Sequence, residues 1–385
     1  MNESAPADTR TMPVLVALLV FVLINAALVM MWGVRMGGDS GIYLDGARAL
    51  ASGEPLSVRQ PSYAGYIAFI SVIQSIGGGM IGVVVAQVAA ALGAAVVVGK
   101  MAAHLAGPAA AAIAILLFAI DVETNRWHAF ILSDSLFLSM LTLATWLVYR
   151  ARRLRRGATA LAVVVMLLAA LVRPEGWFLL PAAVVFWIAS ATAGAARLIA
   201  AAALVVLGGV LVLALVPRLS GNLTAVGPAD MLRRGQTIWD FDGWRIEMPP
   251  DAVFNDGHAS SADAIVYAWR HPLSTVTLMT ARVAVHFAHV RPYFSAAHNA
   301  VVVVWLAPVY ALAAWGFWMW RRHPLSRWCL AAIATQTVVV ALTHADWDGR
   351  YLAHVLPLMY PFTASGAVNL IGGRRAGVMS GAGVA

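Results

Sequence analysis

The chain has 385 residues, of which 61% are hydrophobic and only 11% are charged. A soluble domain carries about 25% charged residues, so this composition excludes an ordinary soluble protein. The net charge of +8 could suit nucleic acid. The arginines, however, stand in short clusters at the ends of apolar runs, which is a topology signal of membrane proteins. We therefore expect a membrane partner and no nucleic-acid partner, and the single cysteine excludes an intramolecular disulfide.

Apolar runs long enough to cross a bilayer recur along the chain. About 20 helical residues, at a rise of about 1.5 Å each, cross a hydrocarbon core of about 30 Å. The first run is too long for a cleaved signal peptide, so we expect it to stay as the first helix. The sequence predicts an all-α polytopic membrane protein with about ten transmembrane helices: 13–33, 80–99, 107–121, 128–149, 158–173, 177–193, 198–216, 300–320, 328–344 and 351–371.

The positions of the cationic residues predict the orientation of these helices. If the N-terminus is cytoplasmic, the inside loops hold thirteen Lys and Arg residues and the short outside loops hold six, as the positive-inside rule requires. The opposite orientation would place the arginine-rich run 150–156 outside. We therefore expect a multi-pass protein of the cell inner (plasma) membrane, with residues 1–385 forming a single membrane domain and both termini in the cytoplasm.

Two exterior segments are long enough to carry a function. Segment 34–60 contains an amphipathic helical pattern, and the stretch 61–76 after it is expected to be a helix or half-helix at the exterior surface. The second exterior segment is 217–299. Within it, 272–290 has polar residues at helical spacing on one face. We expect an interfacial helix there, because a spanning helix would invert every later loop.

Two acidic residues are candidates for catalysis. Asp39 follows two glycines and precedes a helical pattern, a position that suits either a helix N-cap or a catalytic carboxylate, with Tyr43 one turn further on the same face. Asp134 lies inside an apolar run, roughly 9 Å below its outer end. An ionisable residue at that depth is costly and indicates function. The alternative for Asp134 is a structural hydrogen bond to a neighbouring helix.

Two arginines at outer helix ends are candidates for binding substrate. Arg173 stands in an exterior turn, where Glu175 can pair with it, and a snorkelling side chain is the alternative. Arg350 and Tyr351 begin the last apolar run at the level of the headgroups. A guanidinium donates two parallel hydrogen bonds to a phosphate, whereas an interfacial anchor would use Arg and Tyr equally well.

Metal-binding and nucleotide-binding patterns are weak. His286 and His289 could share a metal ion at helical spacing, although a solvated helix face is the commoner reason for such a pair. Two D-x-D patterns, at 240–242 and 346–348, occur outside any soluble α/β domain. No Walker A sequence appears, so nothing indicates an ATP-driven pump. The sequence does not identify a cofactor, and a divalent metal ion is the candidate.

Six motifs, taken in chain order, carry a resemblance to a known family. They are D-S-x-x-Y…A-x-x-L-x-x-G (39–53), P-S-Y-x-G-Y (61–66), L-S-D-S-L-F (132–137), R-P-E-G (173–176), R-H-P (270–272) and R-Y-L-x-x-x-x-P (350–357). Over about residues 13–371, the order of these motifs and the side of the membrane on which each is expected resemble those of a known enzyme family. This family is the GT-C membrane glycosyltransferases of the protein O-mannosyltransferase and lipid A aminoarabinose transferase type.

The resemblance implies a GT-C-like fold and a function. It implies transfer of a sugar from a polyprenyl-phosphate donor to a lipid, glycan or protein acceptor on the non-cytoplasmic face. Ser40 follows Asp39 where the family often has a second acid, and the soluble C-terminal domain of many relatives does not follow the last helix. The acceptor is therefore left open. The candidate catalytic residues are Asp39 and Asp134, and the candidate substrate-binding residues are Tyr43, Tyr66, Arg173, Arg350 and Tyr351.

Physical reasoning reaches the same class independently. Nucleotide sugars are cytoplasmic, so an outward-facing transferase needs a donor held in the membrane. Its site needs a carboxylate to deprotonate the acceptor hydroxyl and cations to hold the leaving phosphate. The rivals are a transporter or flippase, which would show broken helices in two related halves, and a scaffold, which would not need a buried Asp134.

Overall fold

The computed structural model describes residues 11–57, 59–153, 156–191, 228–252 and 261–371. This part of the chain is almost entirely helical, and its only sheet is a two-stranded ribbon. Four of its helices are long and apolar enough to cross a membrane: α1 (Met12–Trp32), α4 (Gly79–Ile120), α13 (Ala296–Met319) and α14 (Pro324–Leu342). The prediction of an all-α membrane protein is thereby confirmed. The predicted span 198–216 lies outside the described residues.

Helix α4 consists of two helical arms folded back on each other. The backbone leaves the helical region at Ala106 and Gly107, immediately before Pro108, whose ring blocks continuation of a helix. A Cβ added at Gly99 would touch the side chain of Ile115. In a straight helix, residues sixteen positions apart would lie about 24 Å apart. The two apolar runs predicted on either side of this turn are therefore antiparallel neighbours.

The other helices of the bundle surround these arms. Helix α15 packs against α4 and α13, and α6 packs against α4 and α7. Every residue of α15 from Leu352 to Gly366 is buried, which places this helix at the centre of the core. The bounds of these helices are α6 (Ser133–Arg150), α7 (Arg156–Val172), α8 (Leu179–Ala191) and α15 (Arg350–Ile371). Short helical turns connect them: α5 (Val122–Asn125) and the 3₁₀ turns Arg126–Ala129, Ala151–Arg153 and Pro174–Phe178.

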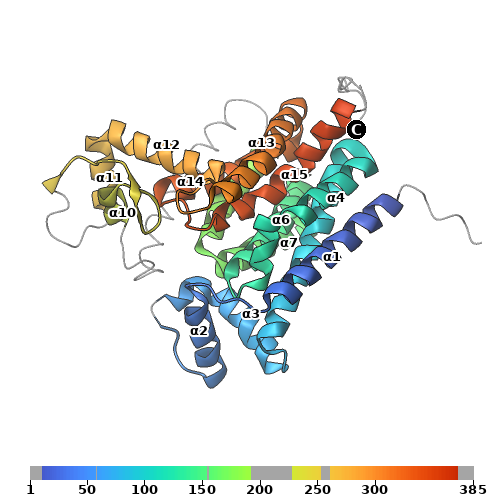
Figure 1. Cartoon of the computed structure of the whole chain (residues 1–385), viewed down its shortest axis with the longest axis horizontal. Coiled ribbons are helices and arrows are strands. Elements are labelled where there is room, and N and C mark those ends of the chain that lie inside the picture. Colours follow the sequence, from blue (N-terminus) through green and yellow to red (C-terminus); the bar gives the residue numbers. More distant parts are fainter. Residues whose placement is uncertain (1–10, 58, 154–155, 192–227, 253–260, 372–385) are drawn as a thin grey trace, which may run out of the picture.

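One end of the bundle carries two groups of shorter elements in addition to the long helices. The first group consists of α2 (Ser40–Ser52), a 3₁₀ turn (Gln60–Tyr63) and α3 (Ala64–Ser75). Figure 1 shows these elements where α1 ends, far from the beginning of α1 and the end of α15. Helices α2 and α3 occupy the segments in which the sequence predicts an amphipathic helix and a surface helix. We call this end of the molecule the site end.

The second group extends from α10 to α12. It contains α10 (Pro228–Arg234), the antiparallel strands β1 (Gln236–Ile238) and β2 (Phe241–Arg245), α11 (Ser261–Arg270) and α12 (Pro272–Ala288). Helix α12 lies in the predicted amphipathic segment. Its apolar Leu273 and Val276 are exposed, whereas Thr275, Arg282 and His286 are buried. The polar face of α12 therefore packs on the protein, and its apolar face is free to meet lipid.

The expectation that His286 and His289 lie on a solvated face is consequently wrong. Each side chain is only 2% exposed. The periodicity correctly separates the two faces of α12. It does not show which face points away from the protein. The surroundings of a membrane protein are apolar, so the polar face of a helix can pack against the protein interior.

Candidate functional site

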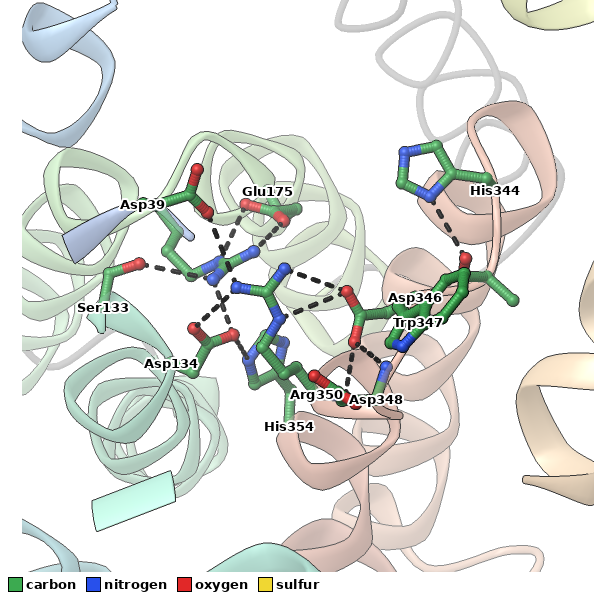
Figure 2. A network of polar contacts seen from close by, with 12 residues as sticks. Asp39, Ser133, Asp134, Glu175, His344, Asp346, Trp347, Asp348, Arg350 and His354 are labelled. Atoms are coloured by element: carbon green, nitrogen blue, oxygen red, sulfur yellow. Dashed lines mark hydrogen bonds and ion pairs between the residues drawn. The ribbon is translucent and has the colours of Figure 1, made fainter. Parts of the chain in front are cut away.

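Charged side chains from four separate segments meet at the site end (Figure 2). The segments are the beginning of α2, the beginning of α6, the turn after α7, and the turn that leads from α14 into α15. Each side chain stands at or near a helix end, where the chain leaves the apolar interior. The cluster consists of Asp39, Asp134, Arg173, Glu175, Asp346, Arg350 and His354. We call it the charged cluster.

Asp134 is the centre of the charged cluster. It is the second residue of α6 and is 1% exposed. Its Oδ1 accepts a hydrogen bond from Arg173 at 2.6 Å and lies 3.1 Å from Nε2 of His354. Its Oδ2 lies 3.8 Å from Arg350. A carboxylate buried to this extent must be paired, and here the partners are two arginines and a histidine.

Arg173 is fully engaged within the cluster. Its guanidinium donates to both carboxylate oxygens of Glu175, with N–O distances of 2.9 and 3.3 Å, in addition to Asp134. The predicted pairing of Arg173 with Glu175 is therefore present. The guanidinium also lies 5.5 Å from the centre of the Tyr351 ring, and the side chain is only 4% exposed. These contacts leave Arg173 little capacity to bind a ligand.

Arg350 connects the buried centre of the cluster with its exposed edge. Its Nε and Nη2 donate to Oδ1 of Asp346 at 3.2 and 3.0 Å. Its Nη1 lies 3.5 Å from Asp39 and 3.8 Å from Asp134. Burial raises the pKa of Asp346, but Arg350 outweighs this and holds that pKa below its usual range. The Arg350 side chain is 20% exposed, so one edge of its guanidinium remains accessible.

The structure does not show the capping hydrogen bond that the N-cap interpretation of Asp39 requires. The residue occupies the N-cap position of α2, yet its side chain makes no capping hydrogen bond. The carboxylate faces Arg350 instead and is 40% exposed. Ser40 closes the local turn, because its hydroxyl accepts from the Gly37 backbone and donates to the Ile131 carbonyl, both at 2.8 Å. Ser40 is thus a structural residue.

The two predicted substrate-binding tyrosines of the first exterior segment differ in position. The Tyr43 hydroxyl lies 3.5 Å from the hydroxyl of Ser133, next to Asp134. The ring of Tyr66 meets that of Tyr43 edge-on at 5.1 Å. The Tyr66 hydroxyl is occupied by a 2.7 Å hydrogen bond to Gln87, and the side chain is fully buried. Tyr43 therefore adjoins the charged cluster, whereas Tyr66 packs behind it.

Two buried arginines fix the turn that precedes Arg350. Arg291 donates to the carbonyl oxygens of Asp346 at 2.9 Å and Trp347 at 3.2 Å. Arg282 donates to those of Ala341 at 3.2 Å and Leu342 at 3.3 Å. Both guanidiniums are 0% exposed, and neither pairs with a carboxylate of the described chain. Burial accordingly lowers the pKa of Arg282 to about 10. These arginines couple α12 to the position of the Asp346 carboxylate.

A second polar group lies near the same turn. Glu123 pairs with Arg126 at 3.0 Å and lies 3.5 Å from His289 and 3.2 Å from His298. Within the residues that the structure describes, no set of three or more His, Cys, Asp or Glu side chains is arranged to hold a metal ion. His286 and His289 thus have no third ligand among these residues.

Sequence reasoning missed two members of the charged cluster. Asp346 and His354 lie four residues before and four residues after Arg350, a spacing at which side chains meet on a helix. The sequence presents Asp346 only as part of a D-x-D pattern. In the structure, Asp346 is buried beside Arg350, whereas the other D-x-D pattern ends in Asp242, which pairs with Arg245 at 3.5 Å. The two patterns therefore do not form one site.

Comparison with protein-family models and with curated proteins finds no match to this chain. The interpretation of the site therefore rests on its geometry. An exposed carboxylate lies beside a partly exposed guanidinium, and a buried ionic network holds both groups. Such a pair can accept a proton and bind an anion at adjacent points.

Proposed function

We propose that this protein is a GT-C-like membrane glycosyltransferase. It moves a sugar from a polyprenyl-phosphate-linked donor to an acceptor on the non-cytoplasmic face of the membrane. The observation that carries the proposal is the approach of Asp39 to Arg350, 3.5 Å apart at the site end of an apolar helical bundle. A base next to an anion-binding cation is what a transfer from a lipid phosphate requires.

The reaction assigns one role to each group of this pair. The acceptor hydroxyl oxygen attacks C1 of the sugar and forms the new glycosidic bond. The bond between C1 and the phosphate oxygen breaks, and its electron pair leaves with the polyprenyl phosphate. Asp39 takes the proton of the acceptor hydroxyl, and Arg350 stabilises the negative charge on the leaving phosphate. Asp39 suits the first role because its carboxylate is 40% exposed and has one ionic partner among the described residues.

Arg350 is a better candidate for the phosphate site than Arg173. Arg350 is 20% exposed and its Nη1 makes only longer contacts, whereas Arg173 is 4% exposed and is held by two carboxylates at 2.6 and 2.9 Å. A bound phosphate would have to displace those carboxylates from Arg173. The ring of Tyr351 packs against the buried guanidinium of Arg173, which lies 5.5 Å from the ring centre.

Asp134 is assigned a positioning role. Its Oδ1 is shared between Arg173 and His354, so it is a poor acceptor for a further proton. Removing it would take away the buried carboxylate that Arg173 and His354 share, and breaking a buried ion pair by removing one partner typically costs about 3–5 kcal/mol. The carboxylate therefore orients Arg173, His354 and Arg350 around the reacting groups.

The proposal includes the topology predicted from the charges: about ten spans, both termini cytoplasmic, and the site end outside the inner membrane. Cysteines placed at Ser52 and Ala158 test it, because the native Cys329 is buried and gives little background. A membrane-impermeant maleimide applied to intact cells should label Ser52→Cys and spare Ala158→Cys. Labelling of the Ala158→Cys variant alone would show that the topology is the opposite of the one proposed.

The function is tested with the purified full chain in detergent. Radiolabelled polyprenyl-phosphate sugars are mixed with a cell-envelope extract that supplies lipid, glycan and protein acceptors. We expect label to move to an acceptor while free polyprenyl phosphate is released, and parallel reactions with and without EDTA show whether a divalent ion takes part. If no donor sugar is released, and the labelled lipid instead crosses the bilayer of proteoliposomes, the protein is a transporter or flippase.

A further inference from the structure

Positive charge gathers at the end of the bundle opposite the site end. Three connections form this end: the turn inside α4 and the segments 150–156 and 320–327. The stretches of sequence around them contain no Asp or Glu: 55–120, 135–174 and 264–345. The cations here form no ion pair with a carboxylate of the described residues: Lys100, Arg150, Arg152, Arg153, Arg156, Arg321, Arg322 and Arg327. We call this set the cationic end.

The cationic end lies far from the charged cluster. Arg150 follows Asp134 by sixteen positions in α6, which is about 24 Å along a helix. The Trp320 indole donates to the hydroxyl of Ser365 at 2.7 Å, so the connection after α13 lies beside the last turns of α15. The proposed reaction centre therefore does not explain why these cations are present.

Two rings bring the cations of different segments together. The ring of Tyr149, near the end of α6, lies 5.8 Å from the ring of His323, which precedes α14. The Tyr149 hydroxyl is 2.7 Å from Nε2 of His104 in α4. The Arg152 guanidinium covers the Tyr149 ring at 4.3 Å, and Arg321 stands two residues before His323. Cationic and imidazole groups from all three connections thus meet around one pair of rings.

The surroundings of these two rings favour a negative charge. Burial, together with the neighbouring His104 and Arg152, lowers the pKa of His323 to about 4, so a further positive charge is disfavoured there. Arg152 donates to the Tyr149 carbonyl at 3.2 Å, which leaves other N–H groups of its guanidinium available, since Arg carries five. A guanidinium without a carboxylate partner suits a phosphate, because a phosphate accepts two parallel N–H groups.

Apolar side chains beside these cations show what else the ligand must offer. The Arg321 guanidinium lies 4.9 Å from the ring centre of Trp318, and Trp318 stacks on Trp315 with both indoles exposed. Leu330 is exposed one turn after Arg327. A soluble anion would leave this apolar surface uncovered. An anion that carries hydrocarbon chains covers it, and the membrane supplies such an anion as a phospholipid.

We infer that the cationic end binds the phosphate group of an anionic membrane phospholipid, with Arg152 and Arg321 as ligands. The lipid would join α4, α6 and the connection between α13 and α14 at one point. Because a ligand of the folded state stabilises it, this lipid should raise the melting temperature. The inference does not depend on the proposed function, since it concerns the other end of the molecule.

The test compares an anionic with a zwitterionic phospholipid. The full-length protein in a neutral detergent is titrated with phosphatidylglycerol and with phosphatidylcholine of the same acyl chains. Native mass spectrometry measures the bound lipid, and melting temperatures are recorded with each lipid and with inorganic phosphate. The variants are Arg152→Gln and Arg321→Gln. The matched control is Arg48→Gln, which removes the same charge at the site end, where Arg48 pairs with Asp45.

We expect phosphatidylglycerol to bind at least tenfold more tightly than phosphatidylcholine and to raise the melting temperature. Arg152→Gln and Arg321→Gln should each weaken phosphatidylglycerol binding by about fivefold, the usual effect of one cation near an anionic lipid surface. Binding of phosphatidylcholine should not change. The melting temperature without lipid should change little, because neither arginine has an ionic partner among the described residues. Arg48→Gln should bind both lipids as the unmodified protein does.

Four outcomes would overturn the inference. The two lipids may bind equally, or both variants may keep the full preference for phosphatidylglycerol. Arg48→Gln may lose as much affinity as they do, which would show an effect of net charge alone. Inorganic phosphate may raise the melting temperature as much as phosphatidylglycerol does, which would show a site for soluble anions. Each of these outcomes leaves the proposed sugar transfer untouched.

Discussion

Replacing Asp39 by Asn tests separately the two proposed roles, proton acceptance by Asp39 and phosphate binding by Arg350. Asn has nearly the same size as Asp but cannot take a proton from the acceptor. We therefore expect turnover to fall by about 10²- to 10⁴-fold, the usual effect of losing a general base. Donor affinity should not fall, because the donor phosphate is an anion and the cluster already has more carboxylates than guanidiniums. The substitution removes one of these negative charges. Its carboxylates are Asp39, Asp134, Glu175 and Asp346, and its guanidiniums are Arg173 and Arg350.

The size of the affinity change follows from the geometry. Asp39 lies 3.5 Å from Arg350, so a phosphate on the other side of that guanidinium would be roughly 7 Å from the carboxylate. Two unit charges at that distance repel by about 0.6 kcal/mol at a dielectric constant of 80 and about 2.4 kcal/mol at 20. Asp39 is 40% exposed, so the lower value applies. Donor affinity should rise by about threefold in Asp39→Asn.

The assay measures donor binding and single-turnover transfer on the same purified preparation. Asp45→Asn is the matched control, because Asp45 is an acid in α2 that is 60% exposed and, in the described part of the chain, pairs with Arg48 alone. It should leave both quantities unchanged. The reasoning is refuted if Asp39→Asn transfers sugar at a near-normal rate. It is equally refuted if this variant loses donor affinity tenfold while remaining folded.

Three further predictions concern other parts of the site. Arg350→Lys should lose donor affinity at least tenfold, because Lys lacks the planar guanidinium that can donate two parallel hydrogen bonds to a phosphate. Arg173→Gln should mainly lower the melting temperature, because it removes the cation that pairs with Glu175 and the nearest cation to the buried Asp134. Lipid titration showing the reverse would move the phosphate site to Arg173. Arg291→Met should release the turn that carries Asp346. It should therefore raise KM for the donor more than it lowers kcat. An unchanged KM in steady-state kinetics would contradict this prediction. Burial lowers the pKa of His286 to about 3 and that of His344 to about 4, against about 6.5 in the unfolded chain. Their contribution to stability is therefore present above about pH 6.5 and is lost as the pH falls toward the lowered pKa values. A melting temperature that stays constant from pH 7 to pH 4 would contradict this prediction.

Much of the charged cluster could be predicted because charge is rare in an apolar chain. Asp134 stands inside an apolar run, and Arg173 and Arg350 stand at the outer ends of such runs. Burying an ionised group is costly unless it is paired. Each of these residues therefore needs a partner, and on a common side of the membrane they can partner one another. The structure brings Arg173 to 2.6 Å and Arg350 to 3.8 Å from Asp134.

The remaining partners could not be predicted, because they depend on which distant segments meet. Arg291 reaches the Asp346 carbonyl across 55 positions of the chain, and no local pattern marks a backbone acceptor. His354 has an ordinary place in an apolar helix until α6 brings Asp134 to 3.1 Å from it. The short strands β1 and β2 escape notice for a related reason. Strand β1 also forms a bridge to Ala345, which lies in a distant segment, and the side chains of the two strands show no strong alternation.

The most direct test of the account is simultaneous measurement of donor breakdown and acceptor labelling. The full chain, reconstituted in nanodiscs, is given radiolabelled polyprenyl-phosphate sugars and cell-envelope acceptors. The account predicts that free polyprenyl phosphate and labelled acceptor appear in equal amounts. It also predicts that Asp39→Asn binds the donor but forms both products about 10²- to 10⁴-fold more slowly. Release of polyprenyl phosphate at the unmodified rate by Asp39→Asn, or no release by the unmodified protein with any donor, would contradict it.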